Sequence, residues 1–203
     1  MASRTIRFAL AALLVAAAGC STVVVRDEPI SVPVSGTNWE SRRLGGGAEI
    51  PTAPLVTALI EYIRSTHVQA LDAVWKGKPF TAEVVIKGDG ESVTIVILAP
   101  QMRLATIKLM RPHRIEYERA SRIPDAFAPE YAVVDVAFAL LPTQVLANVL
   151  GTSFTVKDDG RWRELLCGSD VVRSLERRTG GEIFFVNPQA EYECTIKTLE
   201  EVP

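Results

Sequence analysis

The chain has 203 residues, with 22 lysines and arginines against 24 aspartates and glutamates, so its formal net charge is −2. No block of basic residues occurs, and nucleic acid is therefore not expected as a partner. Hydrophobic residues make up 48% of the sequence, which is enough for one domain with a substantial core.

The first 19 residues have the three-part layout of a signal peptide. Arg4 and Arg7 precede an apolar run over residues 8–18. This run is too short to span a bilayer with roughly 30 Å of hydrocarbon, which favours a cleaved segment over a membrane anchor. Small residues then lead directly to Cys20.

This arrangement resembles the lipobox of bacterial lipoproteins, in which the signal is cut before a cysteine that carries the lipid. Ala17 departs from the leucine usual in that motif. By resemblance to the enterobacterial sorting rule, Ser21 favours the outer membrane. We therefore expect an outer-membrane lipoprotein, anchored through lipid on Cys20 and facing the periplasm; an ordinary secretory signal is the alternative.

Residues 20–52 are rich in proline and glycine, which predicts a flexible tether, although residues 22–25 could add a strand. Thr52 is a candidate cap for a helix that ends near residues 64–66. From there the apolar period changes from helical to alternating, with Gly or Pro turns between the runs. The expected strands cover residues 67–75, 80–87, 92–98, 102–110 and 113–118.

Residues 129–150 interrupt the strands with two expected helices. Pro129 suits a first helical residue, residues 131–141 are apolar almost all round, and Pro142 separates this helix from one that stops at Gly151. A helix that is apolar on all sides must be covered on all sides, most simply by the concavity of a curved sheet. Further strands are expected at residues 154–157, 161–167, 170–177, 182–186 and 191–197. The predicted fold is α+β, with an antiparallel curved sheet in a single domain over residues 53–203.

Two segments carry a resemblance to a known family. They are the apolar helix with its proline, residues 129–142, and the C-terminal block over residues 183–196. Across roughly residues 66–199 the chain resembles small bacterial lipoproteins of unknown function that are often encoded in aryl polyene biosynthesis clusters. That family is similar to the LolA/LolB lipoprotein carriers. The resemblance implies an unclosed half-barrel whose hydrophobic cavity accepts acyl chains, and a loop residue that touches the membrane.

These implications lead to a non-catalytic carrier hypothesis. The ligand would be an acyl chain, a lipoprotein or an aryl polyene lipid, with no cofactor. The alternatives are a scaffolding lipoprotein of an envelope assembly complex and an enzyme that acts on a lipid conjugate. The residues expected to line the cavity, unless they pack a solid core, are Val84, Ile86, Ile95, Ile97, Leu104, Phe138, Leu141 and Val145. Phe127 is the candidate membrane-contact residue; its alternative is packing on the core.

The remaining side chains give no catalytic motif. His67 and His113 have no partner at metal-ligand spacing, and no nucleophile elbow or phosphate loop occurs. Cys167 and Cys194 could form a disulfide in an exported protein or remain buried thiols. The late arginines could hold an acidic head group or be scattered surface charge; they are Arg161, Arg163, Arg173, Arg177 and Arg178. We predict no enzyme and no metal site.

Overall fold

The computed structural model describes residues 30–32, 50–100, 102–120 and 129–202. The first half of this region consists of β1 (Ile30–Val32), α1 (Thr52–Tyr62), β2 (Thr66–Trp75), β3 (Lys78–Gly88), β4 (Ser92–Ala99), β5 (Met102–Met110) and β6 (Arg114–Arg119). The second half consists of α2 (Pro129–Leu140), α3 (Thr143–Leu150), β7 (Phe154–Asp158), β8 (Trp162–Cys167), β9 (Asp170–Arg177), a short 3₁₀ turn at Thr179–Gly181, β10 (Glu182–Asn187) and β11 (Tyr192–Val202).

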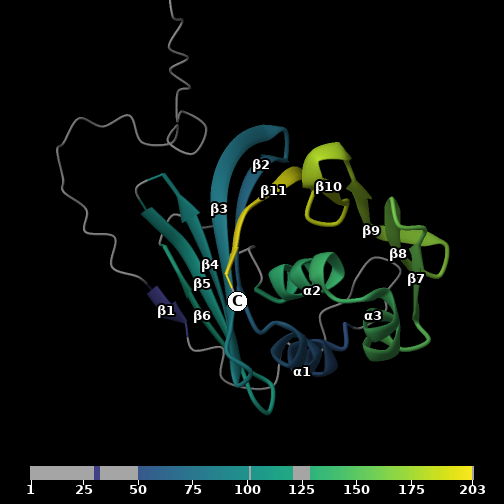
Figure 1. Ribbon diagram of the computed structural model, residues 1–203, viewed down its shortest axis with the longest axis horizontal. Coiled ribbons are helices and arrows are strands. Elements are labelled where there is room, and N and C mark those ends of the chain that lie inside the picture. Colours follow the sequence, from purple (N-terminus) through teal and green to yellow (C-terminus); the bar gives the residue numbers. More distant parts are fainter. Residues whose placement is uncertain (1–29, 33–49, 101, 121–128, 203) are drawn as a thin grey trace, which may run out of the picture.

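The strands form one antiparallel sheet in the order β1-β6-β5-β4-β3-β2-β11-β10-β9-β8-β7. Most neighbouring strands are joined by a hairpin, and the pairing of β2 with β11 connects the group β2–β6 to the group β7–β11. The sheet curves so that β2–β6 form one wall and β7–β10 form the other, with the helices between them (Figure 1). Because β1 and β7 lie at opposite ends of the order and do not pair, the sheet is an unclosed half-barrel. The predicted α+β class is confirmed.

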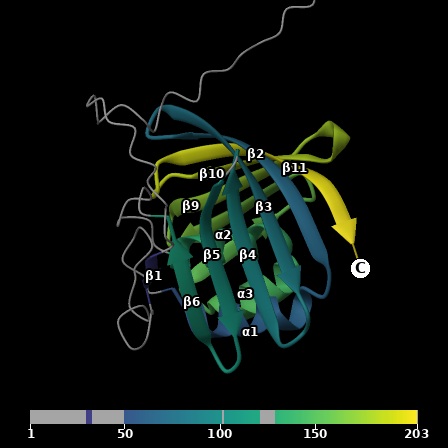
Figure 2. The ribbon, with the colours of Figure 1, turned by 90° about the vertical axis from the view of Figure 1, so that its left-hand side faces the viewer.

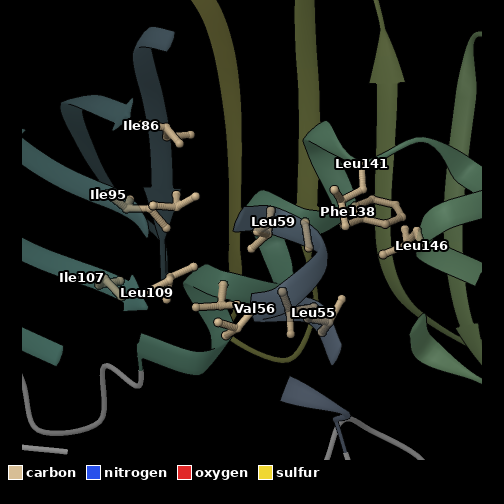
Figure 3. Close-up of a cluster of buried hydrophobic side chains, with 14 of the residues drawn as sticks. Leu55, Val56, Leu59, Ile86, Ile95, Ile107, Leu109, Phe138, Leu141 and Leu146 are labelled. Carbon is tan, nitrogen blue, oxygen red and sulfur yellow. The ribbon is translucent and has the colours of Figure 1, made fainter. Parts of the chain in front are cut away.

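Alternation along the strands determines which side chains meet the helices. In β3, Ala82, Val84 and Ile86 are buried. Their chain neighbours Glu83 and Lys87 point to the other face and are exposed. Corresponding residues of β4 and β5 continue this apolar face, which packs against α1 (Figure 3). The wall β2–β6 therefore meets the helices through aliphatic contacts. Burial of this apolar area gives the main free-energy gain that holds the curved sheet against the helices.

The helices begin and end near the predicted residues. Pro142 separates α2 from α3, and Gly151 follows α3 with a positive φ of 70° that suits a residue without a Cβ. The expectation for Thr52 was wrong. Pro51 occupies the cap position and gives no side-chain cap, whereas the Thr52 hydroxyl donates a hydrogen bond to the carbonyl of Ile50.

Gly88 allows α1 to approach the sheet closely. A Cβ at this position would lie 2.1 Å from the backbone oxygen of Ile63, the residue that follows α1. The Gly88 N–H also donates to the carbonyl of Ser65. Any larger residue would therefore push the end of α1 away from β3.

The tether prediction needs one correction. Ile30, Ser31 and Val32 form strand β1, which pairs with Arg119, Glu118 and Tyr117 of β6. The first half of the expected tether thus contributes an edge strand, because three extended residues reach the open side of β6. Residues 22–25 lie outside the described part of the chain. Within that part, no helix is long and apolar enough to cross a membrane.

Candidate functional site

An apolar depression of about 500 Å³ lies where α1 and α3 pack side by side. Its floor comes from Ala53, Pro54, Thr57 and Ala58 of α1 together with Val145 and Val149 of α3. The two valines are four residues apart and share one face of α3, so that helical spacing alone places both at the site. The volume lies within the range of small-molecule sites, about 300–1,000 Å³.

Three polar residues complete the lining of this depression: Glu61, His113 and Asn148. His113 comes from the turn between β5 and β6, so the wall of the sheet also contributes to the site. An apolar floor with a few polar groups suits a ligand that has an apolar chain and a small polar end.

The residues predicted to line a cavity occupy the boundary between sheet and helices. Val84, Ile86, Ile95, Phe138 and Leu141 are buried members of the hydrophobic core, which the helices fill. Ile97 and Val145 are partly buried against that core. Of all the predicted residues only Val145 also lines the depression. The apolar site therefore lies at the α1–α3 contact instead of deep within the sheet.

Leu104 is the one predicted residue that does not join this core. The pairing of β4 with β5 passes from Leu98–Arg103 to Ile97–Ala105, which leaves Leu104 as the extra residue of a bulge. Ala105 takes the inward position and is 2% exposed. Ala105, Ile107 and Leu109 hold the buried, inward positions of β5, so Leu104 is out of phase with them and only half-buried.

A buried cluster of polar residues attaches α2 to the other wall. Asp135 of α2 accepts a hydrogen bond from Arg173 Nε of β9 at 2.5 Å. Asn187 of β10 and the hydroxyl of Tyr192 of β11 donate to the same carboxylate. Arg173 is fully buried, and its Nη1 also donates to Gln189 at 3.0 Å. Burial and the adjacent Asp135 raise the pKa of Tyr192 well above its usual value, so its hydroxyl keeps its proton.

A second cluster holds the corner between α2 and α3. Arg163 of β8 donates through Nη1 to the carbonyls of Phe138 and Leu141, at 2.7 and 2.9 Å, where α2 ends. Its Nε donates to Asp158 at 2.6 Å. A guanidinium is favourable at this end of a helix because the last carbonyls lack helical partners and carry partial negative charge.

Asp158 is the acidic centre of this second cluster. Desolvation alone would raise the pKa of its carboxyl group. Hydrogen bonds from Arg177, Thr143 and Arg163 outweigh that effect and hold the pKa well below the ordinary value of 3.8. Asp158 therefore stays ionised at neutral pH and neutralises the buried Arg163.

The arginines between residues 161 and 178 include both buried and surface residues, a difference that the sequence did not reveal. Arg163 and Arg173 are buried structural residues. They are therefore neither a site for an acidic head group nor surface charge, the two alternatives that the sequence left open. Arg161 and Arg178 lie at the surface and both pair with Glu176. Contacts from residues distant in the chain distinguish these two groups of arginines. The one local signal is that Arg163 and Arg173 lie at inward positions of alternating strands.

The two cysteines are free and buried. Cys167 lies on β8 and Cys194 on β11, so that β9 and β10 separate them. Three strand spacings of about 4.8 Å make roughly 14 Å, well beyond the Cα separation that a disulfide allows. Of the two alternatives, the structure supports buried thiols. Burial, together with Asp135, raises the pKa of Cys194 to about 12.

Two other predicted site residues, Cys20 and Phe127, lie outside the described residues. Among the described ones, no group of three histidines, cysteines or acidic residues is placed to hold a metal. The ring of His67 lies 3.0 Å from the Ser65 hydroxyl and 3.7 Å from Glu201 of the neighbouring strand β11.

In the described part of the chain, the fold and the site define a class of protein. It is an α+β protein whose open antiparallel sheet wraps around three helices, with an apolar depression where α1 and α3 meet. Comparison with known families covers β2–β11 with α2 and α3, but neither β1 nor α1. Residues 66–200 match the family described as protein of unknown function (DUF3261), and the chain belongs to that family. None of the curated proteins matches the chain.

Proposed function

We propose that this protein is a lipid-anchored outer-membrane protein that binds or passes a hydrophobic ligand without catalysis. The observation that carries the proposal is the apolar depression between α1 and α3. An acyl chain is the ligand class that fits best, because each buried CH₂ contributes about 0.8 kcal/mol and needs no polar partner. The acyl group of a lipoprotein or of an aryl polyene lipid would meet the same requirement.

Two further observations support this proposal. The unclosed sheet is consistent with the half-barrel expected from the resemblance to LolA/LolB carriers. The signal-like segment that ends at Cys20 supplies a reason for the protein to lie beside a membrane. A binding site for acyl chains would be useful beside a membrane, because apolar chains need to be shielded from water when they leave the bilayer.

The ligand site is tested with Val149→Asp in the intact protein. A carboxylate on the floor of the depression must be desolvated by a bound chain, so we expect binding to weaken at least about tenfold. The measurement is titration with a dansyl-labelled undecanoic acid, followed by fluorescence. Val171→Asp is the matched control, because Val171 is 40% exposed on β9 and does not line the depression.

The control should retain wild-type affinity. Circular dichroism should show both variants folded under the binding conditions, although Val149→Asp should unfold at a lower urea concentration because Val149 packs partly against the core. Absence of probe binding by the wild-type protein would reject the ligand proposal. Equal affinity in Val149→Asp and Val171→Asp would remove the depression as its site.

The anchor is tested with Cys20→Ser expressed in a Gram-negative cell. Loss of the thiol removes the atom that would carry lipid, so we expect the protein to move from the membrane fraction to the soluble periplasmic fraction. Immunoblotting of the two fractions provides the measurement, and Cys167→Ser is the control. Membrane association that persists in Cys20→Ser would contradict lipid anchoring at this residue.

A further inference from the structure

The last residues of β11 form a free strand edge. The final pair between β10 and β11 is Glu182–Lys197, whereas β11 continues beside β2 as far as the pair Val202–Thr66. Residues 198–202 thus have a strand on one side only, within the described part of the chain. Figure 2 shows this end of β11 at the outer margin of the wall, beyond β2. We call residues 198–202 the β11 edge.

Among the described residues, the β11 edge is accessible and has no strand on the side away from β2. All five of its residues are exposed, and they include the large apolar side chains of Leu199 and Val202, which are 54% and 43% exposed. In an antiparallel strand the N–H and C=O groups point alternately to the two sides. Half of the backbone groups of the β11 edge therefore point away from β2, in the position that an added strand would occupy.

Charge on the β11 edge restricts what can pair with it. Glu200 and Glu201 are adjacent, and the bulge near Leu199 further interrupts its regularity. Antiparallel pairing with a second copy would place glutamates opposite glutamates, which is destabilising. A segment with basic residues at those two positions would gain attraction instead of repulsion, and its apolar neighbours would contact Leu199 and Val202.

We propose that the β11 edge is an interaction site that accepts an extended, basic segment of a partner protein as an added antiparallel strand. The backbone of the β11 edge supplies the hydrogen bonds, and Glu200 with Glu201 selects the partner by charge. The inference does not depend on the hydrophobic-ligand proposal, because β11 contributes no residue to the α1–α3 depression.

The test uses the intact protein and a peptide labelled at its N-terminus, fluorescein-Thr-Val-Lys-Lys-Val-Thr-amide. Fluorescence anisotropy should show saturable binding, and amide hydrogen exchange should slow in residues 198–202. Glu200→Lys combined with Glu201→Lys should weaken this binding about tenfold. The same variant should gain affinity for the peptide in which both lysines are replaced by glutamate.

Two controls separate strand addition from simple charge attraction. Glu191→Lys with Glu193→Lys makes the same charge change at and beside the start of β11, where β10 already pairs, and should leave the affinity unchanged. A peptide methylated on every backbone nitrogen keeps its charge but loses its donors on both edges, and it should not bind. If this methylated peptide binds as well, or if the unmodified peptide does not bind or protects other amides, the inference is overturned.

Discussion

Asp135→Ala should lower the free energy of unfolding by about 3–5 kcal/mol, the usual cost of leaving a buried charge without its partner. Arg173 is fully buried and places its Nε 2.5 Å from the lost carboxylate. Asn187 and Tyr192 lose the same acceptor. Urea unfolding followed by circular dichroism measures the change.

A second variant distinguishes the loss of charge pairing from a general effect of the substitution. Asp135→Leu combined with Arg173→Met removes both charges and restores apolar volume, so it should recover most of the stability lost in Asp135→Ala. Asp72→Ala is the matched control for removing an aspartate, since Asp72 is exposed on β2. A loss in Asp135→Ala below about 1 kcal/mol would show that Arg173 is not held by this carboxylate.

Arg163→Met should also cost about 3–5 kcal/mol, because it removes a buried cation from a paired carboxylate and from two helix-terminal carbonyls. The guanidinium side chain is 6% exposed, and Asp158 lies 2.6 Å away. Arg161→Met is the control: that arginine is 70% exposed in its pair with Glu176, and surface pairs of this kind contribute about 0–1 kcal/mol. The measurement is again urea unfolding.

The pH dependence of Arg163→Met gives an independent readout. In the wild-type protein the pKa of Asp158 is depressed below 3.8, so its stabilising contribution is present above that pH. The contribution is lost as the pH falls from 3.8 toward the lower folded value. Without Arg163 the pKa of Asp158 rises, and less stability should be lost on acidification. An unchanged acid profile would mean that Arg163 does not act through Asp158.

The order and type of the elements could be predicted from sequence because hydrophobic period is a local property. The change from alternate apolar residues to a run apolar all round marked the boundary between β6 and α2, and Pro142 marked the break before α3. The extents were less accurate. β11 continues five residues beyond the predicted end, since pairing with β2 extends the strand without any apolar pattern.

The site itself was only partly accessible from sequence. Val145 was predicted to line a cavity, and it lines the depression, but its partners Ala53, Pro54 and Ala58 were not identified. Small residues on a helix give no signal of a binding surface until the facing helix is known. The proposed cavity residues were correctly recognised as apolar and inward, except for Leu104, but packing of the helices decides whether such residues line a space or fill it.

By itself, the sequence determined the α+β class, the antiparallel strand meander and the helical insertion, since these follow from residue period and from the geometry of proline and glycine. It also provided the pattern around Cys20 on which the anchoring proposal depends. Only the tertiary structure decided that Arg163 and Arg173 are buried, that Cys167 and Cys194 lie on strands too far apart to bond, and that β11 ends with a free edge. Each of these depends on which distant strands pair. Pairing is a property of the whole sheet, and no local pattern encodes it.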